Sequence, residues 1–234
     1  MSVISVVVPA YNSERTVEEV IRRIQQLRIA DHEFECIVVD DCSTDATWQK
    51  LSALPGITAI HHETNTGKGG AVRTGLERAR GDYLVVEDDD MEYDPLEIPD
   101  VLRPLLEGRA DVVYGSRGLN PDNTYISPLY HYGGKVINLL VGSVLRRRIT
   151  DSISGTKALT RAAYEQIAPL ESQGFGVETE ITAKAVRLGL TLVEVPISFR
   201  PRSHAEGKNI RWYHAFDLIS ALLRHSFWRR GPPH

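Results

Sequence analysis

Residues 85–95 read VVEDDDMEYDP, and they join the end of an apolar run to four consecutive acidic residues. The run from Tyr83 to Val86 does not alternate with polar positions, which predicts a strand covered by helices on both faces of its sheet. We expect this strand to occupy residues 83–87. Adjacent carboxylates repel one another unless a cation or strong donors compensate. The end of this strand is therefore a candidate site.

Four other short apolar runs have the same character, at residues 4–8, 34–39, 57–60 and 112–114. Between the first two, apolar residues recur at the spacing of a helix, namely Val17, Val20, Ile21, Ile24 and Leu27. Strands that alternate with helices predict an α/β fold with a doubly wound, mostly parallel central sheet and helices on both faces.

The second half of the chain changes in composition. We expect a long loop (119–134), an apolar helix that ends at three arginines (135–145), a helix (177–188), a strand within 191–201 and a terminal helix from about Ile210. No internal repeat is present. We predict one domain over residues 1–234, divided into a core half (1–117), an elaboration of it (118–209) and a C-terminal amphipathic helix and tail (210–234).

Polar segments follow each of the first four predicted strands: PAYNSE (9–14), DDCSTD (40–45), ETNTGKGGAVRTG (63–75) and EDDDMEYD (87–94). In doubly wound sheets, ligands bind outside the carboxyl ends of the strands. All four segments should therefore meet at one edge of the sheet.

The acidic cluster at this edge favours a metal site. Mg²⁺ and Mn²⁺ prefer hard oxygen ligands, and they commonly use one or two carboxylates together with substrate phosphates. The alternative is a solvated acidic turn before a helix that Asp94 and Pro95 would start.

The third polar segment suits an anion. Gly67, Gly69 and Gly70 precede a predicted helix, and Lys68 and Arg73 add positive charge. Backbone N–H groups at a helix N-terminus, together with two cations, suit a diphosphate. The alternative is a glycine-rich loop with solvated charges. Neither GxGxxG nor GxxxxGK[ST] occurs, which argues against a dinucleotide oxidoreductase or a P-loop enzyme.

Composition adds limits on partners. The formal net charge of −4 gives no overall field that would favour nucleic acid. Cys36 and Cys42 have neither metal-ligand nor disulfide-framework spacing. No signal-peptide pattern and no run of about 18 apolar residues is evident. We therefore expect a cytoplasmic protein.

Taken together and in order, these four segments resemble the family 2 glycosyltransferases with the GT-A fold. The later segments DVVYGSR (111–117), TDSISGTK (150–157), GFGVETEITAK (174–184) and VEVPISFRPRSHAEGK (193–208) are similar to the dolichyl- or polyprenyl-phosphate sugar synthases, which use mannose or glucose. The resemblance implies that residues 1–117 bind a nucleotide-sugar and that residues 118–209 bind the acceptor. It leaves GDP-mannose and UDP-hexoses both open.

The resemblance also implies residue roles on the donor side. Donor-binding residues would be Pro9, Tyr11, Glu14, Asp40, Asp41, Lys68, Arg73, Asp88 and Asp89, and Mg²⁺ or Mn²⁺ would be held by Asp90 and Glu92. Asp40 and Asp41 would lie at the base and ribose. Asp89 stands where the family usually has Ala, and Glu92 where it has Gln, so the site carries extra negative charge. Ser13 stands where the family has an acidic residue, and Glu14 follows it.

On the acceptor side, the resemblance implies an inverting transfer of a hexose to polyprenyl or dolichyl phosphate. The acceptor phosphate would be bound by Arg117, His131, Arg202 and Lys208, and the catalytic residues would be Asp90 and Arg117. Asp151 and Glu180 are assigned to orientation or structure. A phosphate monoester with a second pKa near 6 is largely dianionic at neutral pH and needs no general base.

Reaching a lipid requires contact with a membrane. The terminal helix carries Trp212, Phe216, Ile219, Leu223 and Phe227 at three- and four-residue spacing, with arginines around its end. Such a stripe suits peripheral attachment to the cytoplasmic face of a membrane, directly or through a separate membrane protein. The helix over 135–145 has a similar stripe, which we expect to pack on the core. Two rival hypotheses remain. One is a family 2 enzyme with a soluble or cell-wall saccharide acceptor, and the other is a catalytically silent nucleotide-sugar sensor or a subunit that binds a partner through its terminal helix.

Overall fold

The computed structural model describes residues 1–125, 128–202 and 214–228, and the side chains of residues 128–131 and 214 are not described. The strands are β1 (Ser2–Ala10), β2 (His32–Asp40), β3 (Thr58–His61), β4 (Tyr83–Val86), β5 (Val112–Ser116), β6 (Lys157–Thr160) and β7 (Leu192–Pro196). The helices are α1 (Val17–Gln26), α2 (Thr47–Ala53), α3 (Lys68–Arg78), α4 (Ile98–Leu106), α5 (Pro128–Leu145), α6 (Arg161–Ile167), α7 (Gly176–Arg187) and α8 (His214–Ser226). Short 3₁₀ turns, η1 (Pro95–Glu97) and η2 (Arg117–Leu119), follow β4 and β5.

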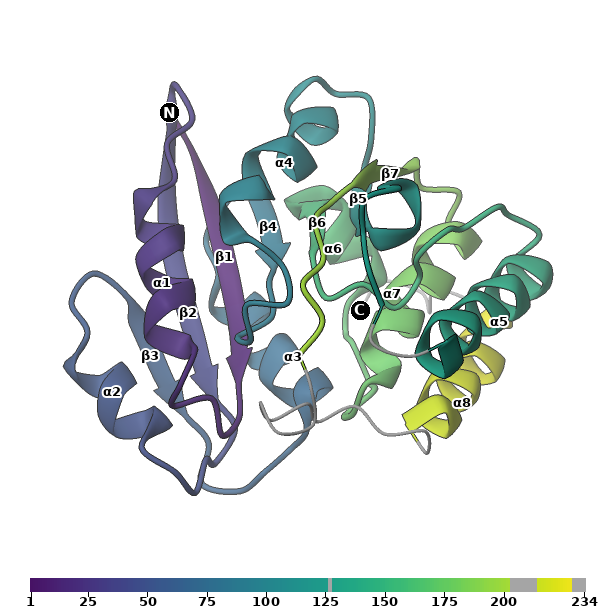
Figure 1. Ribbon diagram of the computed structural model, residues 1–234. Coiled ribbons are helices and arrows are strands. Elements are labelled where there is room, and N and C mark those ends of the chain that lie inside the picture. The colour runs from purple at the N-terminus through teal and green to yellow at the C-terminus, as the bar shows by residue number, and fades with distance from the viewer. Residues whose placement is uncertain (126–127, 203–213, 229–234) are drawn as a thin grey trace.

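The strands form one sheet in the order β3-β2-β1-β4-β6-β5-β7 (Figure 1). Every neighbouring pair is parallel except those of β6, which runs antiparallel to both β4 and β5. The chain moves outward from β1 to β3 and then returns to the other side of β1 as β4. This reversal between β1 and β4 is the point where doubly wound sheets bind ligands. The predicted α/β, mostly parallel sheet is confirmed.

Helices cover both faces of the sheet because successive strand residues point to opposite sides. Val6 and Val8 of β1 pack in one core cluster with α1 and α4, whereas Val7 packs in a second cluster with α3, α6 and α7. The side chains of all three valines are fully buried. The continuous apolar run in the sequence therefore reflects a strand with two buried faces.

Helices α5 and α8 lie outside this core, against α7 (Figure 1). Val141 and Leu145 of α5 join a small cluster with Ala183 of α7 and Leu222 of α8. The other side of α5 is exposed, with Leu139 at 69%. The prediction that the apolar stripe of this helix packs on the core is therefore wrong for half of the stripe. No helix in the described part of the chain is long and apolar enough to cross a bilayer.

Two further features differ from the predictions. Helix α5 starts at Pro128, within residues expected to form a loop, because proline is well suited to the first turn of a helix. Strand β6 and helix α6 were not predicted. Strand β6 has only four residues and begins with a lysine, and its position between β4 and β5 depends on pairings distant in sequence.

Candidate active site

The carboxyl ends of β1 and β4 are joined by the side chain and backbone of Asp89. Its Oδ2 accepts a hydrogen bond from the Tyr11 amide at 3.1 Å, and its carbonyl accepts one from Thr16 Oγ1 at 2.7 Å. Burial, reinforced by the charge of Asp88, raises the pKa of Asp89 to about 6, although the bond from Tyr11 opposes this rise. Asp89, which stands where the family usually has Ala, therefore fixes the loop after β1 to the acidic cluster.

Asp90 and Glu92 both face Arg202. Oδ2 of Asp90 lies 2.5 Å from Nη2 of Arg202, and Oε1 of Glu92 accepts a hydrogen bond from the Arg202 amide at 2.8 Å and lies 4.0 Å from its Nε. Burial and the charges of Asp88 and Glu92 raise the pKa of Asp90 to about 7, while Arg202 acts in the opposite direction. The two carboxylates are thus close enough together to contact one cationic group.

This donor set fits a divalent cation. Two carboxylates from neighbouring residues supply the hard oxygen atoms that Mg²⁺ and Mn²⁺ prefer. Within the residues that the structure describes, no group of three histidine, cysteine or acidic side chains is assembled for a metal. The remaining ligands would therefore come from phosphate oxygens and water, as is usual for Mg²⁺.

Asp88 is held against the turn before β6. A Cβ built on Gly155 would lie 1.9 Å from Oδ2 of Asp88, so only glycine permits this approach. Asp88 also pairs with Lys68, with 2.6 Å between Oδ1 and Nζ, and Lys68 pairs in turn with Glu178 at 2.7 Å. Burial lowers the pKa of Lys68, but the charges of Asp88 and Glu178 outweigh it and raise that pKa above its ordinary value.

The glycine-rich segment makes its close contacts within the protein. The Gly67 amide donates to Asp41 Oδ2 at 2.7 Å, and the Gly70 amide donates to the Gln173 carbonyl at 3.1 Å. A Cβ on Gly69 would lie 2.1 Å from the Ser172 carbonyl oxygen. The prediction that these helix N-terminal amides hold a diphosphate is therefore wrong for Gly67 and Gly70. The glycines allow α3 to approach residues 172–173.

The two aspartates at the end of β2 differ in their surroundings. Asp41 accepts hydrogen bonds from the amides of Thr66 and Gly67, and so organises the third loop. Asp40 is fully buried, and its Oδ2 lies 2.7 Å from Nδ1 of His61. Its Oδ1 has no hydrogen-bond partner in the described part of the chain. A buried unpaired oxygen is costly, so this atom is a candidate acceptor for a ligand N–H or O–H.

The remaining predicted donor residues lie around the same edge. Pro9 is buried within β1, and the Tyr11 side chain is exposed. Oε2 of Glu14 accepts the Ala46 amide at 3.0 Å, just before α2. Arg73 of α3 donates from Nη1 to the Leu170 carbonyl at 3.1 Å. Glu14 and Arg73 therefore both have protein partners.

Arg117 is held by a carboxylate and two rings. Its Nε and Nη2 each lie 2.7 Å from an oxygen of Asp151, and its guanidinium carbon lies 5.9 Å and 5.2 Å from the ring centroids of Tyr93 and Phe199. Tyr93 follows Glu92 directly, so Arg117 packs on a ring from the segment that carries the acidic cluster. The His131 side chain and Lys208 lie outside the described residues, so two of the four predicted phosphate-binding residues are placed.

Asp151 and Glu180, which were assigned to orientation or structure, both hold other residues in place. Asp151 orients Arg117 by accepting hydrogen bonds from Nε and Nη2 of that arginine. Glu180 accepts the amides of Glu171 and Ser172 at 2.8 and 2.7 Å and pairs with Lys184 at 2.7 Å. Sequence reasoning missed Lys157 and Glu178, which are buried beside Lys68. In the sequence both look like polar residues of ordinary elements, and no local signal marks their pairing.

Comparisons with known proteins bear on this site. Residues 5–168 match the family described as Glycosyl transferase family 2. A dolichol-phosphate mannosyltransferase from Pyrococcus furiosus is 31% identical over 96% of this chain, which spans 64% of that protein's length. An undecaprenyl-phosphate mannosyltransferase from Micrococcus luteus is 32% identical over 86% of this chain and 85% of its own.

A solved structure is similar over nearly the whole chain. It is the crystal structure of glucosyl-3-phosphoglycerate synthase from Mycobacterium tuberculosis with Mn²⁺, uridine diphosphate and phosphoglyceric acid. Its TM-score is 0.73 at 26% identity, and the likeness covers 98% of this chain and 80% of that one.

These likenesses confirm the predicted GT-A fold and the predicted class of enzyme. The family match runs from β1 to the end of α6 and therefore includes the acidic cluster, the glycine-rich segment and Asp151. The protein belongs to the family 2 glycosyltransferases.

Proposed function

We propose that this enzyme transfers a hexose, with inversion at the anomeric carbon, from GDP-mannose or a UDP-hexose to a polyprenyl phosphate. The proposal rests on one observation above all. Arg202 contacts the two carboxylates suited to a divalent cation, and Arg117 packs against Tyr93, the residue after Glu92. Two arginines at this edge suit a phosphate-bearing acceptor next to the donor diphosphate. The names of the two mannosyltransferase relatives support the same acceptor class.

On the donor side, the proposed roles are metal binding by two carboxylates and donor binding by the residues around them. Asp90 and Glu92 would hold Mg²⁺ or Mn²⁺, which would supply Lewis-acid stabilisation of the leaving diphosphate when bound. Asp88 orients the nucleotide-sugar, and Asp40 offers its unpaired oxygen to the base or ribose. The remaining donor contacts proposed are those of Pro9, Tyr11, Glu14, Asp41, Lys68, Arg73 and Asp89.

The acceptor phosphate would bind at the other side of the acidic cluster. Because Asp151 occupies Nε and Nη2 of Arg117, the phosphate would bind at Nη1. Arg202 adds positive charge, and His131 and Lys208 complete the proposed set. A dianionic phosphate attacks the anomeric carbon without a general base.

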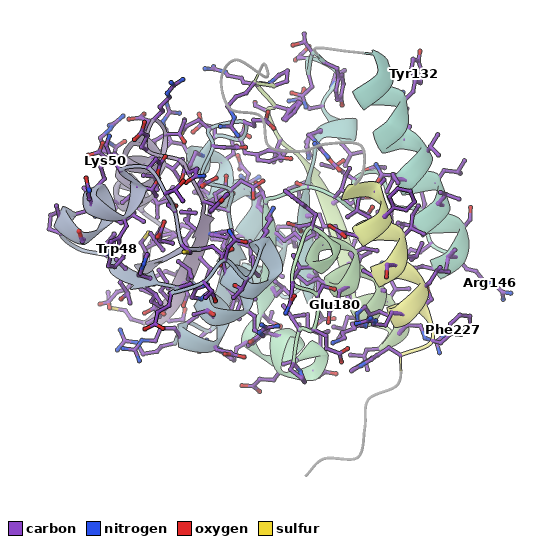
Figure 2. All side chains as sticks on the ribbon, turned by 90° about the horizontal axis from the view of Figure 1, so that it is seen from below. Trp48, Lys50, Tyr132, Arg146, Glu180 and Phe227 are labelled. Carbon is purple, nitrogen blue, oxygen red and sulfur yellow. The ribbon has the colours of Figure 1, made fainter. Side chains whose placement is uncertain are left out.

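The exposed side of α5 and α8 supports peripheral attachment to the cytoplasmic face of a membrane, directly or through a separate membrane protein. Figure 2 shows Tyr132 and Arg146 near opposite ends of α5, and Phe227 at the end of the neighbouring α8. The exposed apolar side chains are Tyr132, Val136, Leu139, Leu140 and Val144 on α5, and Phe216, Ile219, Leu223 and Phe227 on or next to α8. Exposed Arg146, Arg148 and Arg224 lie at the ends of these helices. Aromatic, apolar and basic residues together are typical of an interfacial surface.

A second candidate is transfer to a small soluble phosphorylated acceptor. The solved structure of glucosyl-3-phosphoglycerate synthase, which is similar to this chain, holds phosphoglyceric acid. Such an acceptor would need the same arginines but would not need the exposed apolar side of α5 and α8. That surface is why we favour the lipid acceptor.

A product assay tests the proposal. The protein would be incubated with GDP-mannose or UDP-glucose, Mg²⁺ or Mn²⁺, and a short-chain polyprenyl phosphate, with phosphoglycerate and a saccharide as parallel acceptors. We expect a glycosylated polyprenyl phosphate, and Asp90→Ala should abolish it. Transfer to phosphoglycerate or to the saccharide alone would refute the lipid acceptor. Nucleotide-sugar binding without transfer to any acceptor would favour the sensor.

A further inference from the structure

Four charged side chains form a chain of ion pairs that begins at Asp88 of the acidic cluster and leads into the buried interior. Asp88 pairs with Lys68 at 2.6 Å, Lys68 pairs with Glu178 at 2.7 Å, and Glu178 pairs with Lys157. The four residues come from the loop after β4, from α3, from α7 and from β6. Lys157 has no exposed side-chain surface, and Glu178 has almost none.

This arrangement is balanced in charge, because two carboxylates alternate with two ammonium groups. Buried ions are strongly destabilising unless they are paired, so each member depends on its neighbours. The cation of Lys68 is already matched by Asp88 and Glu178. Within the proposed donor site, the part of Lys68 is therefore to fix the position of Asp88 rather than to act as a separate counter-charge for the diphosphate.

Each member of the Lys157–Glu178 pair holds one of the groups that contact Asp88. Glu178 holds Lys68, which contacts the Asp88 carboxylate directly. Lys157 donates from Nζ to the Ser154 carbonyl, in the turn where Gly155 contacts the same carboxylate. The pair thus controls the two surfaces between which Asp88 lies.

The backbone of Lys68 is also fixed. The amide of Gly67, on one side, donates to Asp41, and the amide of Gly70 donates to the Gln173 carbonyl. With the start of α3 held in this way, the direction of the Lys68 side chain depends on its two carboxylate partners. Removing one of them would let the ammonium group, and with it Asp88, move.

We propose that Glu178 and Lys157 are positioning residues for the donor hexose. Glu178 acts on Asp88 through Lys68, and Lys157 acts on it through the turn at Ser154 and Gly155. This inference rests on the proposed function, in which Asp88 orients the nucleotide-sugar, and it adds that Asp88 does so at the sugar part of the donor. It predicts a specific defect: the pair supports binding of the hexose and leaves binding of the nucleoside diphosphate largely unchanged.

The test compares the affinities for a nucleotide-sugar and for its nucleotide. Calorimetric titrations with Mn²⁺ would use GDP-mannose against GDP, and UDP-glucose against UDP, on the wild-type protein and on Glu178→Gln. Hydrogen bonds to charged groups support about a 10-fold or larger effect. We expect the variant to bind the nucleotide-sugar about 10-fold more weakly, with affinity for the nucleotide changed by less than about 2-fold.

Two further variants separate positioning from stability. Lys157→Met combined with Glu178→Gln leaves no buried ammonium group without a partner, and it should show the same selective loss of sugar affinity even if the single variant unfolds. Tyr114→Phe is the matched control. It deletes a buried 2.9 Å hydrogen bond to Thr182 on α7 but keeps the ring beside Lys157, so it should lower stability without changing the affinity ratio.

The outcomes distinguish the two proposals. A wild-type protein that binds neither nucleotide-sugar would overturn the proposed function, and this inference with it. A wild-type protein that binds one of them, with an unchanged affinity ratio in the folded Glu178→Gln variant, would overturn the inference alone. A double variant with the wild-type ratio of nucleotide-sugar to nucleotide affinity would also overturn the inference. The defect of the single variant would then come from the unpaired charge of Lys157.

Discussion

Replacing Gly155 with alanine should disable the site without unfolding the protein. The new Cβ would lie 1.9 Å from Oδ2 and 2.3 Å from Cγ of Asp88, whereas ordinary contacts begin at 3.4 Å. The carboxylate would have to move by roughly 1.5 Å, a shift that also breaks its 2.6 Å pair with Lys68. A misplacement of about 1 Å can cost about 10²-fold in rate, which is close to 2.7 kcal/mol in the activation free energy.

The assay is kcat/KM for sugar transfer, measured together with the thermal unfolding temperature. Overpacking costs about 1–3 kcal/mol of stability, so activity should be measured well below the unfolding transition. Gly134→Ala is the control, because a Cβ there meets nothing within 4 Å and alanine favours a helix. A Gly155→Ala variant that keeps its rate within about 2-fold of the wild type would refute the reasoning that Asp88 must occupy this position.

Three other predictions follow from described contacts. The Arg202→Gln variant should bind Mn²⁺ about 10-fold more tightly than the wild type, because the metal no longer competes with a charged hydrogen bond to Asp90. Calorimetry without nucleotide measures this affinity, and equal or weaker binding by the variant would contradict the prediction. Leu139→Asp with Leu223→Asp, at positions 69% and 58% exposed, should reduce flotation with anionic liposomes without changing the unfolding temperature. Undiminished flotation would remove this surface from membrane binding. Burial raises the pKa of the Cys36 thiol to about 12. This thiol should therefore react with a disulfide reagent at pH 8 only after unfolding, and fast labelling of Cys36 in the native protein would contradict this prediction.

The sequence predicted the parts of the fold that depend on local pattern. Continuous apolar runs indicated β1, β2, β4 and β5 because those strands are largely buried on both faces. A run also indicated β3, although this edge strand exposes Thr58 and His61. The edge rule brought the polar ends of these strands together. Strand β6 was missed because the four residues from Lys157 carry too short a pattern. Its antiparallel position between β4 and β5 is set by pairing partners more than 40 residues away in β5 and more than 70 residues away in β4.

For the candidate site too, the sequence predicted the local features but not the contacts between distant residues. Residue types at strand ends identified the acidic cluster and the glycine-rich segment, but they did not indicate what each group would contact. The amides of Gly67 and Gly70 donate within the protein, and Lys68 lies between two carboxylates. Such pairings join α3 to α7, and a three-dimensional contact of this kind leaves no periodic signal in either helix.

The crowding of charge at the end of β4 has a structural explanation in these pairings. The three consecutive aspartates each contact a different part of the chain: Asp88 contacts Lys68 of α3, Asp89 contacts the amide of Tyr11 after β1, and Asp90 contacts Arg202 beyond β7. Adjacent like charges are tolerated because each has its own compensating group. The cluster therefore joins the loop after β1 and the start of α3 to the segment after β7. Because the three partners are separate, neutral substitutions of the three aspartates should produce different defects, and a common defect would show that the carboxylates act as one unit.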